Sequence, residues 1–273
     1  MTTISNKSPL RYPGGKTRAC KILNDILADH FNPLDYDTVV SPFFGGGSFE
    51  FHLQNTYGMN IVANDKFGPL YTFWEICRTR KSELCQQLNT NLGDITKERF
   101  TELRKGIMQE TDALTKATSY FIINRCSFSG ATLSGGFSEE SSKKRFTKSS
   151  IDRVSDLDLS KFSISNCDFS EFLSSDHTHT TYNNMRPFVF LDPPYAVEST
   201  LYGDNGDLHE QFDHKRLYEC VSKLDNWMMT YNDCPKIREL YKEYTIIDTK
   251  WSYGMNRTKK SSEIVIISKE VGR

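Results

Sequence analysis

The stretch Phe188-Val189-Phe190-Leu191-Asp192-Pro193-Pro194-Tyr195 joins four large apolar residues to an acid, two prolines and an aromatic residue. A short, wholly apolar run of this kind predicts a buried strand. Proline has no backbone N–H for a strand ladder, so the strand is expected to end at Asp192. The stretch therefore predicts a buried strand that ends in a rigid, acidic turn.

Such a turn suits the capture of a planar exocyclic amine. The Asp192 carboxylate can accept one N–H and the Pro193 carbonyl the other, while the Tyr195 ring lies over the flat face of a base. This arrangement is what methylation of an amino group on a nucleobase requires. A Pro-Pro pair after a strand can also be only a stiff turn opened by Asp, so the rest of the chain has to decide.

The first third of the chain predicts half of a doubly wound nucleotide-binding sheet. A strand at 37–41 precedes Pro42-Phe43-Phe44-Gly45-Gly46-Gly47, a helix at 48–54 begins with Ser48 as its N-cap, and a strand at 60–63 ends at Asn64-Asp65. The glycines let a ligand approach the backbone, although they can also form only a flexible turn. Asp65 is placed to hold ribose hydroxyls, although an acid at a strand end is common.

Two more candidates lie outside this unit. Asp168 follows a strand predicted at 162–164, where it can border an adenine ring or simply cap a helix at 169–173. Lys16 lies in a tight turn before an apolar helix at 19–28 and can alternatively be a surface lysine. The other predicted elements are a strand at 188–191, a helix at 212–225, a strand at 227–231 and a closing antiparallel pair at 244–247 and 263–267.

Charge is unevenly distributed along the chain. Residues 78–153 hold 14 Lys and Arg against 9 Asp and Glu, although the whole chain has a net charge of −1. Unless this is ordinary scatter, a basic segment can meet phosphates while the acidic remainder does chemistry. We expect a catalytic domain of residues 1–77 and 154–273 and an insertion of residues 78–153, helical to about 125, with a mobile loop or hairpin at 127–150.

Bulk properties restrict the class of protein. A chain of 273 residues is long enough for one large core with an inserted subdomain. It contains no apolar run near the roughly 20 residues that a membrane span needs, and its start lacks the apolar core of a signal peptide. Seven scattered cysteines without zinc-ligand spacing predict reduced thiols, no metal site and a cytoplasmic location.

Together these motifs resemble the Dam-type (alpha group) DNA adenine-N6 methyltransferases, which use S-adenosylmethionine. The resemblance spans nearly the whole chain, with the insertion before the Asp-Pro-Pro-Tyr strand. The residues that carry it are Leu10-Arg11-Tyr12-Pro13-Gly14-Gly15-Lys16, Pro42-Phe43-Phe44-Gly45-Gly46-Gly47-Ser48-Phe49, Asn64-Asp65, Asn124-Arg125-Cys126-Ser127-Phe128-Ser129-Gly130, Cys167-Asp168-Phe169 and Asp192-Pro193-Pro194-Tyr195.

The resemblance implies a Rossmann-like methyltransferase sheet with helices on both faces and a smaller, mostly helical DNA-recognition insertion. It implies a site-specific enzyme that flips adenine out of double-stranded DNA and methylates N6. The implied catalytic residues are Asp192, Pro193, Pro194 and Tyr195. The implied cofactor contacts are Tyr12, Lys16, Phe43, Phe44, Gly45, Gly47, Asp65, Asp168 and Asp192. The implied DNA contacts are Arg125, Phe128 as a wedge, Lys143, Lys144 and Arg145.

The resemblance also implies a setting. We expect a monomer that meets DNA in the cytoplasm, at the nucleoid or, for a viral protein, in the host cytosol or nucleus. A cognate restriction endonuclease is an expected partner if the enzyme belongs to a restriction-modification system.

The chain departs from the family pattern at four places: Tyr12 replaces Trp, Ser41 replaces Glu, Lys66-Phe67 replaces a polar pair and Ser129 replaces Asn. Four other functions stay open. They are methylation of cytosine N4, methylation of a protein or RNA amide, DNA binding without catalysis and dinucleotide-dependent oxidoreduction.

Overall fold

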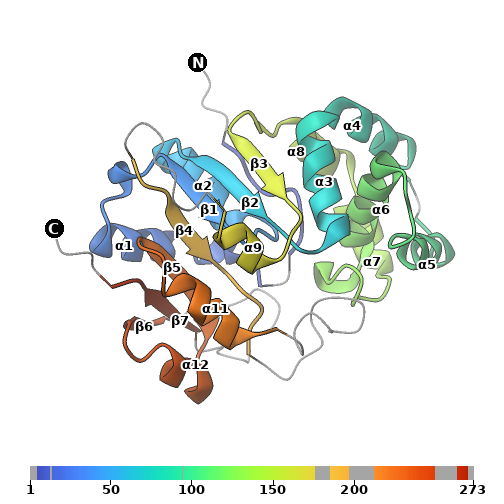
Figure 1. Cartoon of the computed structure of the whole chain (residues 1–273). Coiled ribbons are helices and arrows are strands. Elements are labelled where there is room, and N and C mark those ends of the chain that lie inside the picture. The colour runs from blue at the N-terminus through green and yellow to red at the C-terminus, as the bar shows by residue number, and fades with distance from the viewer. Residues whose placement is uncertain are drawn as a thin grey trace.

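The computed structural model describes residues 5–12, 14–93, 95–175, 185–196, 212–249 and 263–269. In these residues seven strands form one sheet in the order β3-β2-β1-β4-β5-β7-β6 (Figure 1). The bounds are β1 Thr38–Ser41, β2 Asn60–Asn64, β3 Phe162–Ser165, β4 Phe188–Leu191, β5 Trp227–Asn232, β6 Thr245–Thr249 and β7 Glu263–Ile267.

The first five strands run parallel, and β7 pairs antiparallel with both β5 and β6. The predicted closing pair is therefore confirmed, with β7 inserted between β5 and β6. Strand order changes direction between β1 and β4, which lie side by side, and ligands of open α/β sheets bind beyond the carboxyl ends of strands at such a point. The turn after β1 and the turn after β4 meet there.

Both faces of the sheet are covered, because successive side chains alternate between two cores. Val39 and Phe190 belong to the core on the face with α1, α2 and α3, whereas Val40 and Leu191 belong to the core with α9, α11 and α12. This matches the wholly apolar pattern of buried parallel strands. The helices are α1 Cys20–His30, α2 Ser48–Tyr57, α3 Gly68–Thr79, α9 Phe169–Leu173, α11 His214–Val221 and α12 Pro235–Leu240, with short 3-10 turns η1 Lys16–Arg18 and η2 Pro33–Asp35. The predicted α/β fold is confirmed.

The expected N-cap of α2 is wrong by one position. Gly47, not Ser48, caps the helix, and its φ of 65° lies in the left-handed region. A Cβ at Gly47 would lie 2.3 Å from the Phe44 ring, so the chain can fold back at this point only with glycine.

The inserted segment packs beside the β3 edge of the sheet (Figure 1). Its helices are α4 Lys81–Thr90, α5 Lys97–Gly106, α6 Ala113–Cys126, α7 Glu139–Arg145 and α8 Lys148–Ser155, with η3 Phe128–Gly130 between α6 and α7. Phe121 of α6 stacks on Phe73 of α3 with ring centroids 5.7 Å apart, and the apolar core continues from the sheet into these helices. Residues 78–153 as a separate recognition unit remain our proposal.

The loop or hairpin expected at 127–150 is wrong from residue 139 onward, where α7 and the start of α8 lie. Residues 127–138 do contain a short 3-10 turn and loop, in which Ser127 and Phe137 form an isolated antiparallel bridge. Ser138 accepts a hydrogen bond from the Ser141 backbone at the start of α7. Thr147 and Ser150 form a capping box at the start of α8. The serines that suggested a loop therefore start helices by satisfying backbone N–H groups.

Within the described part of the chain, no helix combines the length and apolar character of a membrane span.

Candidate active site

The turn after β4 brings Asp192 to the amino-terminal loop. Lys16 Nζ lies 2.7 Å from both carboxylate oxygens of Asp192 and 3.1 Å from the Gly14 carbonyl oxygen. Only 4% of Lys16 is exposed, so the alternative of a surface lysine is wrong. The same Nζ atom lies 5.1 Å from the centre of the Tyr195 ring. Lys16, which the resemblance placed with the cofactor, thus contacts the turn expected to hold the base.

A buried hydroxyl also contacts Asp192. Thr230 of β5 donates through Oγ1 to Asp192 Oδ1 over 2.6 Å, and none of Thr230 is exposed. The sequence interpretation missed this residue. Its signal is a polar side chain inside the otherwise apolar run Trp227, Met228, Met229 and Tyr231.

Tyr195 is fixed at both ends. Its hydroxyl donates to Glu263 Oε2 over 2.8 Å, and its ring lies 6.1 Å from that of Tyr231. The next residue, Ala196, donates its backbone N–H to Asn232 Oδ1. The acidic turn is therefore attached to β5 and β7, and the sequence interpretation missed Glu263 because it begins an apolar strand.

Tyr12 lies across the glycine turn that follows β1. A Cβ at Gly45 would lie 2.8 Å from Tyr12 Cε1, and Gly45 has a φ of 51°. Gly45 also accepts a hydrogen bond from the Trp74 indole N–H at 3.0 Å through its carbonyl oxygen. Glycine is thus needed here for the Tyr12 ring as well as for the turn.

Asp65 joins the end of β2 to this turn. Its carboxylate accepts the backbone N–H groups of Gly45 and Phe67, each at 2.9 Å. Burial raises the pKa of the Asp65 carboxyl from 3.8 to about 6, and the two hydrogen bonds only partly oppose this.

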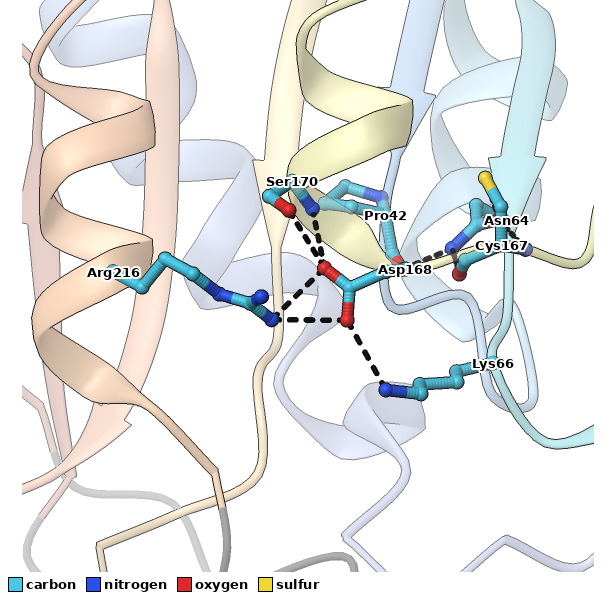
Figure 2. A network of polar contacts seen from close by, with 7 residues as sticks. All are labelled: Pro42, Asn64, Lys66, Cys167, Asp168, Ser170 and Arg216. Atoms are coloured by element: carbon cyan, nitrogen blue, oxygen red, sulfur yellow. Dashed lines mark hydrogen bonds and ion pairs between the residues drawn. The ribbon is translucent and has the colours of Figure 1, made fainter.

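Asp168 lies at the centre of a polar network at the same edge of the sheet (Figure 2). It caps α9 by accepting from the Ser170 backbone at 3.0 Å, which confirms the capping interpretation. It also contacts Lys66 at 3.1 Å and Arg216 at 2.9 Å. Burial opposes ionisation, but the hydrogen bonds from Ser170, Lys66 and Arg216 together hold the pKa of Asp168 well below its usual range.

Glu50 is a buried acid that the sequence interpretation missed. It stands in the first turn of α2, is 2% exposed and accepts a 2.6 Å hydrogen bond from the Ser41 hydroxyl. Burial raises its pKa to about 7; the Ser41 bond opposes the rise, and Asp192 and Lys16 are near enough to act on it. The available signal was its position on the helix that follows the glycine turn.

The predicted DNA contacts divide into one buried residue, Arg125, and four exposed residues. Arg125 is 7% exposed and donates to the backbone carbonyls of Pro9 at 3.1 Å and Arg145 at 2.7 Å. Phe128 is 68% exposed. Lys143, Lys144 and Arg145 lie exposed on α7, where the lysines also pair with Glu139 and Glu140.

Asn124 connects the insertion to the amino-terminal loop. Its side chain accepts from the Arg11 backbone N–H at 2.9 Å and donates to the Arg11 carbonyl at 2.7 Å. Gly130 approaches so closely that a Cβ would lie 2.5 Å from Arg11 Cβ. The loop that carries Tyr12 and Lys16 is thus held by both the sheet and the insertion.

Comparisons with known proteins agree with this architecture. The family model described as D12 class N6 adenine-specific DNA methyltransferase matches residues 12–255. The chain is also similar to the type II methyltransferase M.CviBI of Paramecium bursaria Chlorella virus NC1A. The two are 24% identical over 265 residues, which cover 94% of this chain and 96% of the relative.

Proposed function

The chain belongs to the D12 class of N6 adenine-specific DNA methyltransferases, and we propose that it transfers the methyl group of S-adenosylmethionine to adenine in a short double-stranded DNA sequence. The contact of Lys16 with both oxygens of Asp192 carries this proposal. It joins the acidic turn to the loop that lies over the glycine turn. The site for the target adenine would therefore lie next to the site for the methyl donor.

The described residues fit S-adenosylmethionine at this edge. The rings of Phe43, Phe169 and Phe212 pack with centroids 5.3 to 5.6 Å apart, an apolar surface suited to a purine. Asp65, a buried acid at the end of β2, suits ribose hydroxyls. When bound there, S-adenosylmethionine supplies an electrophilic sulfonium methyl group. The residues proposed to hold it are Tyr12, Lys16, Phe43, Phe44, Gly45, Gly47, Asp65, Asp168 and Asp192.

The acidic turn would orient the adenine amino group. Asp192 accepts one N–H of N6, the Pro193 carbonyl accepts the other, and Pro194 keeps the turn rigid. Tyr195 stacks on the base in an orientation fixed by its bond to Glu263. Positive charge develops on N6 during transfer, and the Asp192 carboxylate stabilises it. Orientation of the nucleophile is the main contribution of these residues.

Base flipping provides access to N6, at a cost of about a few kcal/mol. The exposed ring of Phe128 is suited to fill the space that the base leaves. Lys143, Lys144 and Arg145 supply contacts with phosphates. Because its donors meet backbone carbonyls, Arg125 supports the amino-terminal loop from within the insertion.

We further propose that the enzyme acts as a monomer and modifies DNA for a restriction-modification system with a cognate endonuclease. The printed name of the viral relative, a type II methyltransferase, supports this assignment. The enzyme would then be found where its DNA is, in the cytoplasm or, for a viral protein, in the host cytosol or nucleus.

The test is methyl transfer from labelled S-adenosylmethionine to unmethylated genomic DNA, followed by sequencing that locates N6-methyladenine. We expect label in one short motif with the natural chain and none with Asp192→Ala, which should still bind DNA. Near-normal turnover by Asp192→Ala, or label on cytosine N4, would overturn the proposal.

A further inference from the structure

The two carboxylate oxygens of Asp192 have different hydrogen-bond partners. Oδ1 accepts from Thr230 Oγ1 at 2.6 Å and from Lys16 Nζ at 2.7 Å, whereas Oδ2 accepts from Lys16 Nζ at 2.7 Å. A carboxylate oxygen offers about two lone-pair positions. Within the described residues, these contacts leave an acceptor position on Oδ2.

The sheet places Thr230 beside Asp192. β4 and β5 are parallel neighbours in which Leu191 pairs with Met229, so the next position along each strand brings Asp192 beside Thr230. Thr230 is fully buried, and its backbone is fixed by pairing with Val265 of β7. A valine would suit this apolar run equally well, and a buried hydroxyl without an acceptor is unfavourable. The bond to Asp192 accounts for the threonine.

The bond to Thr230 distinguishes the two oxygens of the Asp192 carboxylate, whereas the contact with Lys16 does not. Lys16 lies at the same distance from both oxygens, so it does not distinguish one from the other. The terminal torsion of an Asp side chain is broad and roughly two-fold. Thr230, a stiff β-branched residue on a central strand, selects one orientation of the carboxylate.

We propose that Thr230 is a positioning residue for methyl transfer, holding Asp192 so that Oδ2 faces the amino group of the target adenine. This inference rests on the proposed function, because it takes Asp192 as the acceptor of that amino group. Thr230 acts through Asp192 and does not touch the base. Its loss should therefore lower turnover and leave binding of DNA and cofactor nearly unchanged.

The experiment compares Thr230→Val, Thr230→Ser and Thr230→Ala with the natural chain. Single-turnover rate, kcat, KM for DNA and affinity for S-adenosylmethionine are measured for each variant. We expect Thr230→Val to lower kcat about 10- to 100-fold, the range of a hydrogen bond to a charged group. KM and cofactor affinity should stay within about two-fold, and Thr230→Ser should restore most of the rate.

Two controls keep the test interpretable. Thr38→Val removes a buried hydroxyl that bonds to Asp37 at the opposite end of β1, and it should leave kcat unchanged. If Thr230→Val does not fold, the Ser and Ala variants still differ by one hydroxyl oxygen. The inference fails if Thr230→Val turns over normally, or if Thr230→Ser is as slow as Thr230→Ala.

Failure of this inference is distinct from failure of the proposed function. If Asp192→Ala is inactive while every Thr230 variant is fully active, Asp192 keeps its role and Thr230 has none. If Asp192→Ala itself turns over normally, the proposed function falls and the inference falls with it.

Discussion

Lys16 and Asp192 stand 176 positions apart, yet Lys16 Nζ lies 2.7 Å from both carboxylate oxygens of Asp192. The pair joins the amino-terminal loop to the turn after β4 and brings a cation to the carboxylate proposed to accept the adenine amino group. With Lys16 4% exposed and Asp192 24% exposed, solvent screens the pair only weakly.

We expect the contributions of Lys16 and Asp192 to the free energy of unfolding to be coupled. Lys16→Met should lower the free energy of unfolding by about 1–3 kcal/mol, because it takes the cation and its hydrogen bonds from an Asp192 carboxylate that is 24% exposed. In Lys16→Met with Asp192→Asn, the loss should be smaller than the sum of the single losses by at least about 1 kcal/mol. Urea unfolding at neutral pH measures the free energy of unfolding of the natural chain, the two single variants and the double variant. Additive losses would contradict the coupling.

Glu50 should make stability depend on pH. Burial raises its pKa from 4.5 to about 7, so the folded protein holds the proton more tightly than the unfolded chain. This contribution to stability is complete below pH 4.5 and is lost as pH rises through about 7, a change of about 3 kcal/mol.

The variant Glu50→Gln does not titrate but can still accept from Ser41. Its free energy of unfolding should vary less with pH over this window than that of the natural chain. Asp65, whose pKa burial raises from 3.8 to about 6, should leave part of the slope in place. Urea unfolding from pH 4 to pH 8 checks the result, and parallel curves for the two proteins would count against it.

Gly45→Ala should disturb the glycine turn more than a left-handed glycine alone explains. The new Cβ would lie 2.8 Å from Tyr12 Cε1. Gly58→Ala is a matched control, because Gly58 has a φ of 74° but no atom within 4 Å of the added Cβ. We expect Gly58→Ala to cost about 1 kcal/mol of stability. Gly45→Ala should cost more and weaken cofactor binding, as thermal unfolding and calorimetric titration would measure. Equal losses of stability would exclude the contact with Tyr12 as the cause.

Arg145 and Arg125 should act differently on DNA. Arg145→Ala should weaken binding and reduce the slope of log affinity against log salt by about 0.9, as expected when one phosphate contact is lost. Arg125→Met should leave that slope unchanged and lower stability, because it removes the hydrogen bonds that Arg125 donates to the backbone carbonyls of Pro9 and Arg145. Fluorescence anisotropy at several salt concentrations distinguishes the two. Equal slope changes would make Arg125 a direct contact.

Phe128→Ala should impair base flipping without affecting the fold. Because the residue is 68% exposed, removal of its ring should change stability by less than about 0.5 kcal/mol. The proposed wedge should be lost, so 2-aminopurine at the target position should show a smaller fluorescence rise on binding. An unchanged rise would remove Phe128 from the flipping step.

The strand pattern and the sharp turns could be predicted from the sequence because they depend on local properties. The apolar run before Asp192 matched β4 residue for residue, and the closing antiparallel pair matched β6 and β7 to within two residues. The helices α7 and α8 could not be predicted, because serine and threonine favour both loops and helix starts. Only the neighbours of Ser138, Thr147 and Ser150 show which of the two occurs.

The sequence by itself determined the class of fold, the order of its elements and the acidic turn that begins at Asp192, because strand periodicity and proline geometry are encoded locally. Only the tertiary structure decided which distant polar groups meet: Lys16 and Thr230 on Asp192, Glu263 on Tyr195 and Arg216 on Asp168. The physical reason is that a sequence pattern shows whether a side chain is buried, but strand order and register decide which partner it finds there.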